Sequence, residues 1–169
     1  MAVVLAAVSI AWFGWGHQGG ELIAWLRWGM VIAAGVLVGA IVLMVRIPAA
    51  PTMASDPHAR RVYWISVAVE AVLIVGGAVV LALTGNGIYL STWTLFVVGV
   101  HFLPFVKPFG APLLRVAAIA CVVVAGLAVW AGIGGWASPP TVACGAGGTL
   151  LLLSAAMFLR SALRLRRQV

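Results

Sequence analysis

The sequence predicts an all-α integral membrane protein, a bundle of six transmembrane helices with both termini cytoplasmic. Hydrophobic residues make up 64% of the 169 positions and charged residues 8%, whereas a soluble domain is about half apolar and about a quarter charged. The apolar residues occur in successive runs, each roughly the 17 to 25 residues that can cross a bilayer. The longest polar interval, residues 46–61, is too short to bury a core of its own, so residues 1–169 form a single transmembrane domain.

The six expected helices follow from these runs and from the turn residues between them. A glycine-containing turn follows the first and the third helix, and proline-containing loops follow the second, fourth and fifth. The first run lacks the basic leader and the cleavage pattern of a signal peptide, so we interpret it as a helix. Gly35 and Gly39 form a GxxxG pair, which is typical of a close-packing helix face. The expected helices cover about residues 1–16, 21–45, 62–84, 88–106, 113–133 and 141–159.

The charged residues give the orientation. Arg27 is the only basic residue on one side of the expected bundle, and the other basic residues lie in the segments on the opposite side. Positive charge favours the cytoplasmic side, which therefore holds both termini. Six of the eight tryptophans mark the outer interface, where tryptophan is enriched. The cytoplasmic residues are Arg46, Arg60, Arg61, Lys107, Arg115, Arg160, Arg164, Arg166 and Arg167.

The net charge of +7 raises the question of a nucleic-acid partner, and the positions argue against one. The basic residues lie at the ends of hydrophobic runs, where anionic lipid headgroups attract them. Arg160, Arg164 and Arg167 are spaced by four and three residues, so they would share one helical face and contact headgroups. We expect the lipid bilayer and cytoplasmic anionic headgroups as partners, and no nucleic acid. A chain of this size is compatible with a homodimer.

Glu70 and His101 are ionisable residues inside expected transmembrane helices. Glu70 lies about nine residues beyond Arg61, roughly 13 Å, and His101 lies six residues before Lys107, roughly 9 Å. The third and fourth helices are antiparallel neighbours, so the two side chains would lie at nearly matching depth. Polar stripes containing Ser66 on the third helix and Thr94 on the fourth would face each other.

A carboxylate at this depth costs about 2.5 to 3.5 kcal/mol on insertion scales. Glu70 is therefore protonated, paired with His101 or Arg27, or exposed to a water-filled cavity. The functional interpretation is a proton- or ion-linked site, and the structural one is a polar contact that fastens two helices. Pro104 would free the carbonyl of Val100 and kink the fourth helix near His101.

Other chemistries lack the residues they need. Glu70 and His101 supply two ligands, where a zinc site needs three or four, so we expect no metal and no cofactor. Cys121 and Cys144 differ in expected depth by roughly 12 to 15 Å, which is beyond the reach of a disulfide. We therefore expect two free thiols.

Two further stretches carry a resemblance. WFGWG occupies residues 12–16 and VGVHFLPFVKPFG residues 98–110, the latter with a His-Phe-x-Pro element at His101, Phe102 and Pro104. Both resemble segments of small, hydrophobic bacterial membrane proteins that carry no assigned function. The resemblance implies a multi-pass protein of the bacterial inner (plasma) membrane and implies nothing about activity.

Three functional interpretations follow, in order of preference. The first is binding or transport of a small solute or ion at a pocket containing Glu70, His101, Ser66 and Thr94. The second is a structural or accessory membrane subunit, in which the same residues join two helices. The third is a membrane-embedded enzyme with Glu70 and His101 as acid and base, although the sequence contains no catalytic signature and a non-enzyme is the expectation.

Overall fold

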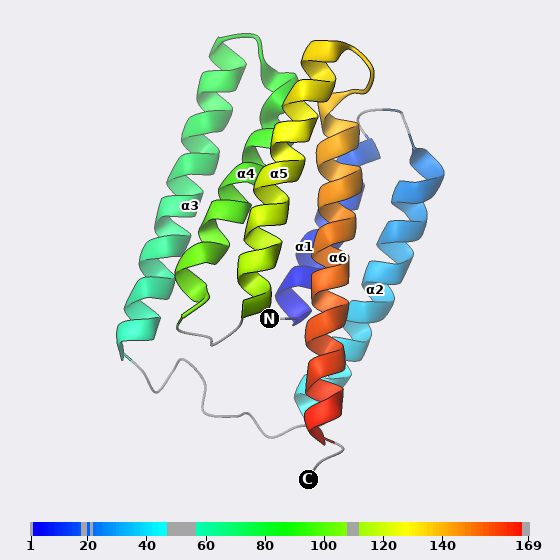
Figure 1. Ribbon diagram of the computed structural model, residues 1–169, viewed down its shortest axis with the longest axis vertical. Coiled ribbons are helices and arrows are strands. Elements are labelled where there is room, and N and C mark those ends of the chain that lie inside the picture. Colours follow the sequence, from blue (N-terminus) through cyan, green and yellow to red (C-terminus); the bar gives the residue numbers. More distant parts are fainter. Residues whose placement is uncertain (1, 18–19, 21, 47–56, 108–111, 167–169) are drawn as a thin grey trace.

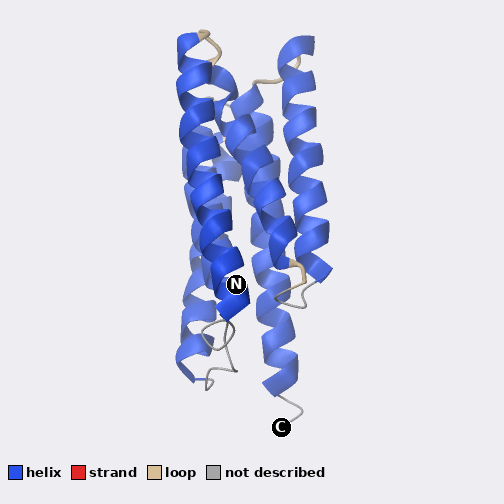
Figure 2. Ribbon diagram, turned by 90° about the vertical axis from the view of Figure 1, so that its left-hand side faces the viewer, coloured by secondary structure: helices blue, strands red, loops and turns tan. Residues whose placement is uncertain are grey.

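The structure of the protein is a computed structural model, which describes residues 2–17, 20, 22–46, 57–107 and 112–166. This part of the chain is all-α, and its helices run side by side along one axis (Figures 1 and 2). Two 3-10 turns, η3 (Gly87–Tyr89) and η4 (Leu103–Phe105), flank the fourth helix. The helices are α1 (Ala2–Gly16), α2 (Ile23–Arg46), α3 (Pro57–Leu83), α4 (Leu90–Phe102), α5 (Pro112–Gly134) and α6 (Pro139–Arg166).

Among the described residues, five helical segments are long and apolar enough to cross a membrane. They are α2, α3, α5, α6 and α4 taken together with its flanking 3-10 turns. Helix α1 has 15 residues, about 22 Å at 1.5 Å per residue, which is shorter than a hydrocarbon core of about 30 Å. The architecture is therefore that of a multi-pass membrane protein.

Proline positions explain why two helices begin earlier than expected. Helix α3 begins at Pro57 and α6 at Pro139, earlier than the expected residues 62 and 141. Proline suits the first helical position, because the N–H that it lacks would have no partner there. His58 and Arg61, expected in a loop, therefore lie at the start of α3. Helix α6 continues to Arg166 rather than ending near residue 159.

The packed core surrounds α1, which lies against α2 and α6. Leu5, Ala6 and Ser9 of α1 are completely buried, and the Ser9 hydroxyl donates to the Ala6 carbonyl at 2.8 Å. Small residues permit the close approach: a Cβ added to Gly16 would lie 2.9 Å from the Cβ of Cys144 on α6. Such small-residue contacts are what allow membrane helices to pack closely.

Helix α3 occupies the edge of the bundle (Figure 1). Its substantial contacts are with α4 and the two 3-10 turns, and none of its described side chains is buried. Trp64, Val72 and Val79 are more than half exposed. The position of α3 relative to the other helices therefore depends on its contact with α4.

The two cysteines are free thiols, as expected. Cys121 lies on α5 and Cys144 on α6, and both are buried. Gly35 and Gly39 do not form the expected close helix contact. A Cβ added to Gly35 would meet nothing within 4 Å, and one added to Gly39 would meet only the side chain of Leu159 at 3.5 Å.

Candidate functional site

The turn between α3 and α4 brings Glu70 and His101 to the same depth. Gly85 adopts a φ of +71° in this turn, the left-handed conformation that glycine adopts readily at a helix end. Glu70 lies 14 residues before Thr84, and His101 lies 15 residues after Asn86. Because the helices are antiparallel and the turn is short, nearly equal separations place the two side chains opposite each other.

Glu70 and His101 form a close pair across this interface. Nδ1 of His101 lies 3.4 Å from Oε2 of Glu70, and the two side chains are 11% and 22% exposed, respectively. Glu70 is the only acidic side chain that the structure describes. The pair therefore gives this carboxyl group a cationic or hydrogen-bonding partner on another helix.

A second contact fixes the proton position on the imidazole. Nδ1 of His101 also lies 3.3 Å from the carbonyl oxygen of Ser66. A carbonyl oxygen can only accept a hydrogen bond, so Nδ1 must carry a proton and donate it. The ring also packs edge-on against Phe105, with centroids 4.7 Å apart.

A third contact holds the part of the same interface that lies nearer the turn between α3 and α4. Nε1 of Trp93 on α4 donates to the carbonyl oxygen of Leu73 on α3 at 2.9 Å. A Cβ added to Gly77 would collide with the indole nitrogen of Trp93, so glycine permits this approach. The accepting residues, Ser66 and Leu73, are seven apart, or about two helical turns, and Glu70 lies between them.

Two cavities flank the Glu70–His101 pair, and both side chains line each of them. The larger cavity has a volume of about 470 Å³ and lies between α1, α3 and the α4–η4 segment. The smaller cavity has a volume of about 230 Å³, and Ser66 and Pro104 are among the residues that line it. The pair thus forms part of the wall between two spaces.

The other expected site residues are placed differently. Ser66 contributes its carbonyl to His101 and lines the smaller cavity. Thr94 is buried, its hydroxyl donates to the Leu90 carbonyl at 2.9 Å, and it lines neither cavity. Pro104 lies in η4, where the chain passes from α-helix to 3-10 geometry after Phe102.

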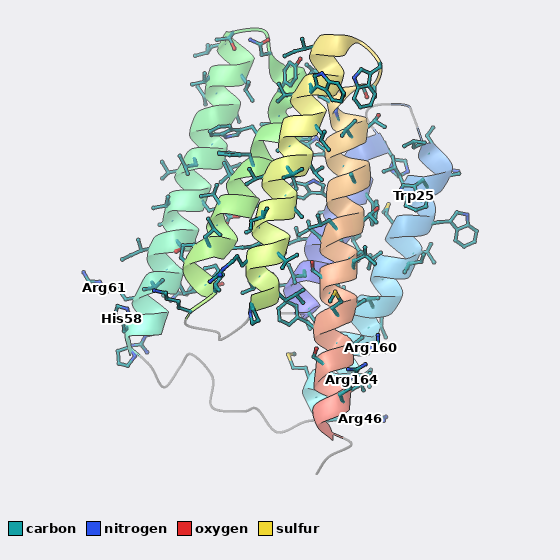
Figure 3. The ribbon with its side chains drawn as sticks, in the orientation of Figure 1. Trp25, Arg46, His58, Arg61, Arg160 and Arg164 are labelled. Atoms are coloured by element: carbon teal, nitrogen blue, oxygen red, sulfur yellow. The ribbon has the colours of Figure 1, made fainter. Side chains whose placement is uncertain are left out.

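Two of the arginines expected to contact headgroups lie on α6 and line neither cavity. Figure 3 shows Arg160 and Arg164 on α6 at the same end as Arg46 of α2, and His58 and Arg61 at the start of α3. Arg160 and Arg164 are exposed. Arg167 lies outside the described residues.

Several residues that line the larger cavity were not expected from the sequence. Tyr63 lies seven residues before Glu70, so helical spacing could have identified it as a residue on the same face of α3. Phe102 and Phe105 flank the histidine in the chain. Val4 and Val8 of α1 also line the cavity, and only the packing of a helix distant in sequence brings them there.

No protein-family model matches the chain, and neither a curated protein nor a solved structure matches it. A fold alone does not assign a function, so the function must be inferred from the residues of the site. Within the described residues, no group of three or more His, Cys, Asp and Glu side chains could hold a metal ion.

Proposed function

We propose that this membrane protein binds a small solute or ion at the Glu70–His101 pair, and that binding is linked to protonation. The observation that carries the proposal is the 3.4 Å approach of Nδ1 to Oε2 in the wall between two cavities. A carboxyl group within a transmembrane segment is costly unless it has such a partner, and intramembrane acids commonly mark substrate or proton pathways.

The net charge of the Glu70–His101 pair depends on how many protons it holds. One proton shared between a carboxylate and an imidazole leaves the pair neutral overall. Removing that proton, or adding a second one, leaves a net charge at membrane depth, where an ionised side chain costs about 2.5 to 3.5 kcal/mol. A charged ligand at this position therefore favours a compensating movement of a proton.

The proposal includes the topology and location in which the site works. Six membrane crossings, both termini in the cytoplasm and a bacterial inner membrane would place the pair in the cytoplasmic half of the bilayer. The ends of α1 and α6 that lie nearest the termini point the same way in Figure 1, which supports an even number of crossings. Arg160 and Arg164 would then contact anionic headgroups.

The test compares wild type with Glu70→Gln, which preserves the shape of the side chain and removes its charge. The free energy of unfolding is measured in detergent between about pH 5 and 8, where an unperturbed imidazole titrates. We expect the stability advantage of wild type to peak at intermediate pH. It falls in acid, where the pair gains a second proton, and in alkali, where the pair loses its shared proton.

Parallel pH profiles for the two proteins would contradict the proposal, because they would show that Glu70 does not change protonation in this range. A second variant, Thr94→Val, is the matched control. It alters a polar residue on α4 that lies outside both cavities, so its profile should follow that of wild type.

An accessory membrane subunit is the second candidate, and the exposure of α3 favours it. A helix whose substantial contacts are with its hairpin partner can pack against a helix of another protein as readily as against lipid. Val72→Trp on the exposed face of α3 would then disrupt assembly with a partner. If the protein instead binds a solute at the pair, Val72→Trp should leave solute binding unchanged. This difference separates the two candidates.

A further inference from the structure

The residues around the larger cavity carry a more specific inference, which rests on the proposed function. We infer that this cavity takes a small lipophilic cation, and that the cation displaces one proton from the Glu70–His101 pair when it binds. The volume of about 470 Å³ is within the range of small-molecule sites, roughly 300 to 1,000 Å³.

The walls of the cavity select for the apolar part of such a ligand. Aromatic rings at Tyr63, Phe102 and Phe105 line one region, and aliphatic side chains from α1, including Val4 and Val8, line another. The rings of Tyr63 and Phe105 lie 5.7 Å apart and share the contact region between α3 and η4. Aromatic faces attract cations as well as apolar groups.

The carboxyl group of Glu70 favours a ligand with positive charge. Among the described residues, Glu70 is the only acidic side chain that lines the cavity. A ligand anion would be repelled by its ionised form at low dielectric. A hard metal cation would require about six or more oxygen ligands, whereas the described lining offers the carboxyl group and the Tyr63 hydroxyl. An organic cation needs no such coordination shell, because its hydrophobic groups contact the walls.

The proton count follows from charge balance at the pair. Before binding, the pair holds one proton, either as carboxylate with imidazolium or as carboxylic acid with imidazole. After binding, the carboxylate faces the ligand cation and the imidazole is neutral. One proton is released per cation in either case, and Nδ1–H of His101 can keep donating to the Ser66 carbonyl throughout.

No other nearby titratable group replaces this pair as the proton donor. Tyr63 is the remaining titratable side chain in the described lining, and the residues that α1 contributes there are apolar. Helices α5 and α6 also pack against α4. The titratable side chains described on these two helices do not line the cavity: Arg115, Cys121, Cys144, Arg160 and Arg164. The proton released on binding is therefore assigned to the pair.

The experiment is isothermal titration calorimetry of the full chain in nanodiscs, with benzyltrimethylammonium as the probe. Titrations in two buffers of different ionisation enthalpy give the number of protons released. We expect about one proton per bound cation and an affinity that rises about tenfold per pH unit while the pair is protonated. Neopentylbenzene, the uncharged isostere, is the control and should bind without releasing a proton.

Two variants keep the test decisive. Glu70→Gln should abolish binding of the cation and leave binding of the uncharged isostere in place. Val8→Trp fills the cavity from α1 without altering either titratable group, so it should abolish cation binding and retain the pH-dependent stability of wild type.

Three outcomes would overturn the inference: no binding of the cation, binding without proton release, or equal binding of the cation to wild type and Glu70→Gln. If one of these results is found and the pH dependence of stability still requires Glu70, the inference about the cation fails but the proposed proton-linked site does not. A stability profile that does not depend on Glu70 would reject the proposed function itself.

Discussion

Two antiparallel helix contacts in this bundle are built from different chemistry. Where α1 meets α6, small residues bring the backbones together, and Leu5, Ala6 and Ser9 are completely buried. Where α3 meets α4, none of the described α3 side chains is buried, and two α4 side chains reach backbone carbonyls of α3. The first contact depends on shape and the second on hydrogen bonds.

The difference matters because lipid removes the usual advantage of apolar burial. Acyl chains are as apolar as leucine, so close packing and polar contacts determine which membrane helices associate. Shape complementarity between α1 and α6 does not respond to pH. The α3–α4 contact includes two ionisable side chains, so its strength can change with a proton or a charged ligand.

The largest expected effect is on the packed contact. Gly16→Leu should lower the free energy of unfolding by about 1–3 kcal/mol, because the new side chain collides with Cys144 and the core cannot expand freely. Gly14→Leu is the matched control on the same helix, since a Cβ there meets nothing within 4 Å. Equal stabilities of the two variants in a denaturant titration would show that the α1–α6 approach is looser than described.

A smaller and more local effect is expected at α3. Gly77→Ala should displace the Trp93 indole and remove its hydrogen bond, at a cost of about 1–2 kcal/mol. Gly76→Ala, where a Cβ meets nothing within 4 Å, should instead gain up to about 1 kcal/mol in helix propensity. Hydrogen exchange should rise in the amides of α3 and remain unchanged in α1, and uniform exchange across both helices would contradict the separation of the two contacts.

The smallest effect is expected from Trp93→Phe. This change removes one hydrogen-bond donor to the Leu73 carbonyl, and such bonds contribute about 0.5–1.5 kcal/mol. The contact between His101 and Ser66 should persist, so α3 stays paired with α4. Complete loss of the pairing, measured as the distance between spin labels on α3 and α4, would show that the indole alone holds the helix.

Much of the arrangement could be predicted from the sequence, because depth in a membrane is nearly a count of residues. The positions of Glu70 and His101 relative to Arg61 and Lys107 predicted matching depth, and the structure places the two side chains 3.4 Å apart. The all-α fold followed in the same way from runs of apolar residues. The early starts of α3 and α6 required weighing proline as a first helical residue as well as a breaker.

Other features depended on rotation and packing, which residue counts do not determine. Thr94 is seven residues from His101 and shares its helical face, yet its hydroxyl is bound within its own helix. The GxxxG spacing at Gly35 predicted a close contact that another glycine, Gly16, makes instead. The α1 side of the larger cavity arises from contact between helices about 60 residues apart in the chain.

The central claim is that Glu70 and His101 act as one charge-coupled unit that joins α3 to α4. A double-mutant cycle with Glu70→Gln and His101→Gln, measured by unfolding in mixed micelles across a range of pH, tests it most directly. We expect a coupling energy of about 0.6 to 1.7 kcal/mol, which are the average and the maximum measured for polar pairs in a membrane protein. The coupling energy should be largest at intermediate pH and smaller on both sides. A coupling energy near zero at every pH would show that the two residues act independently and would contradict the account.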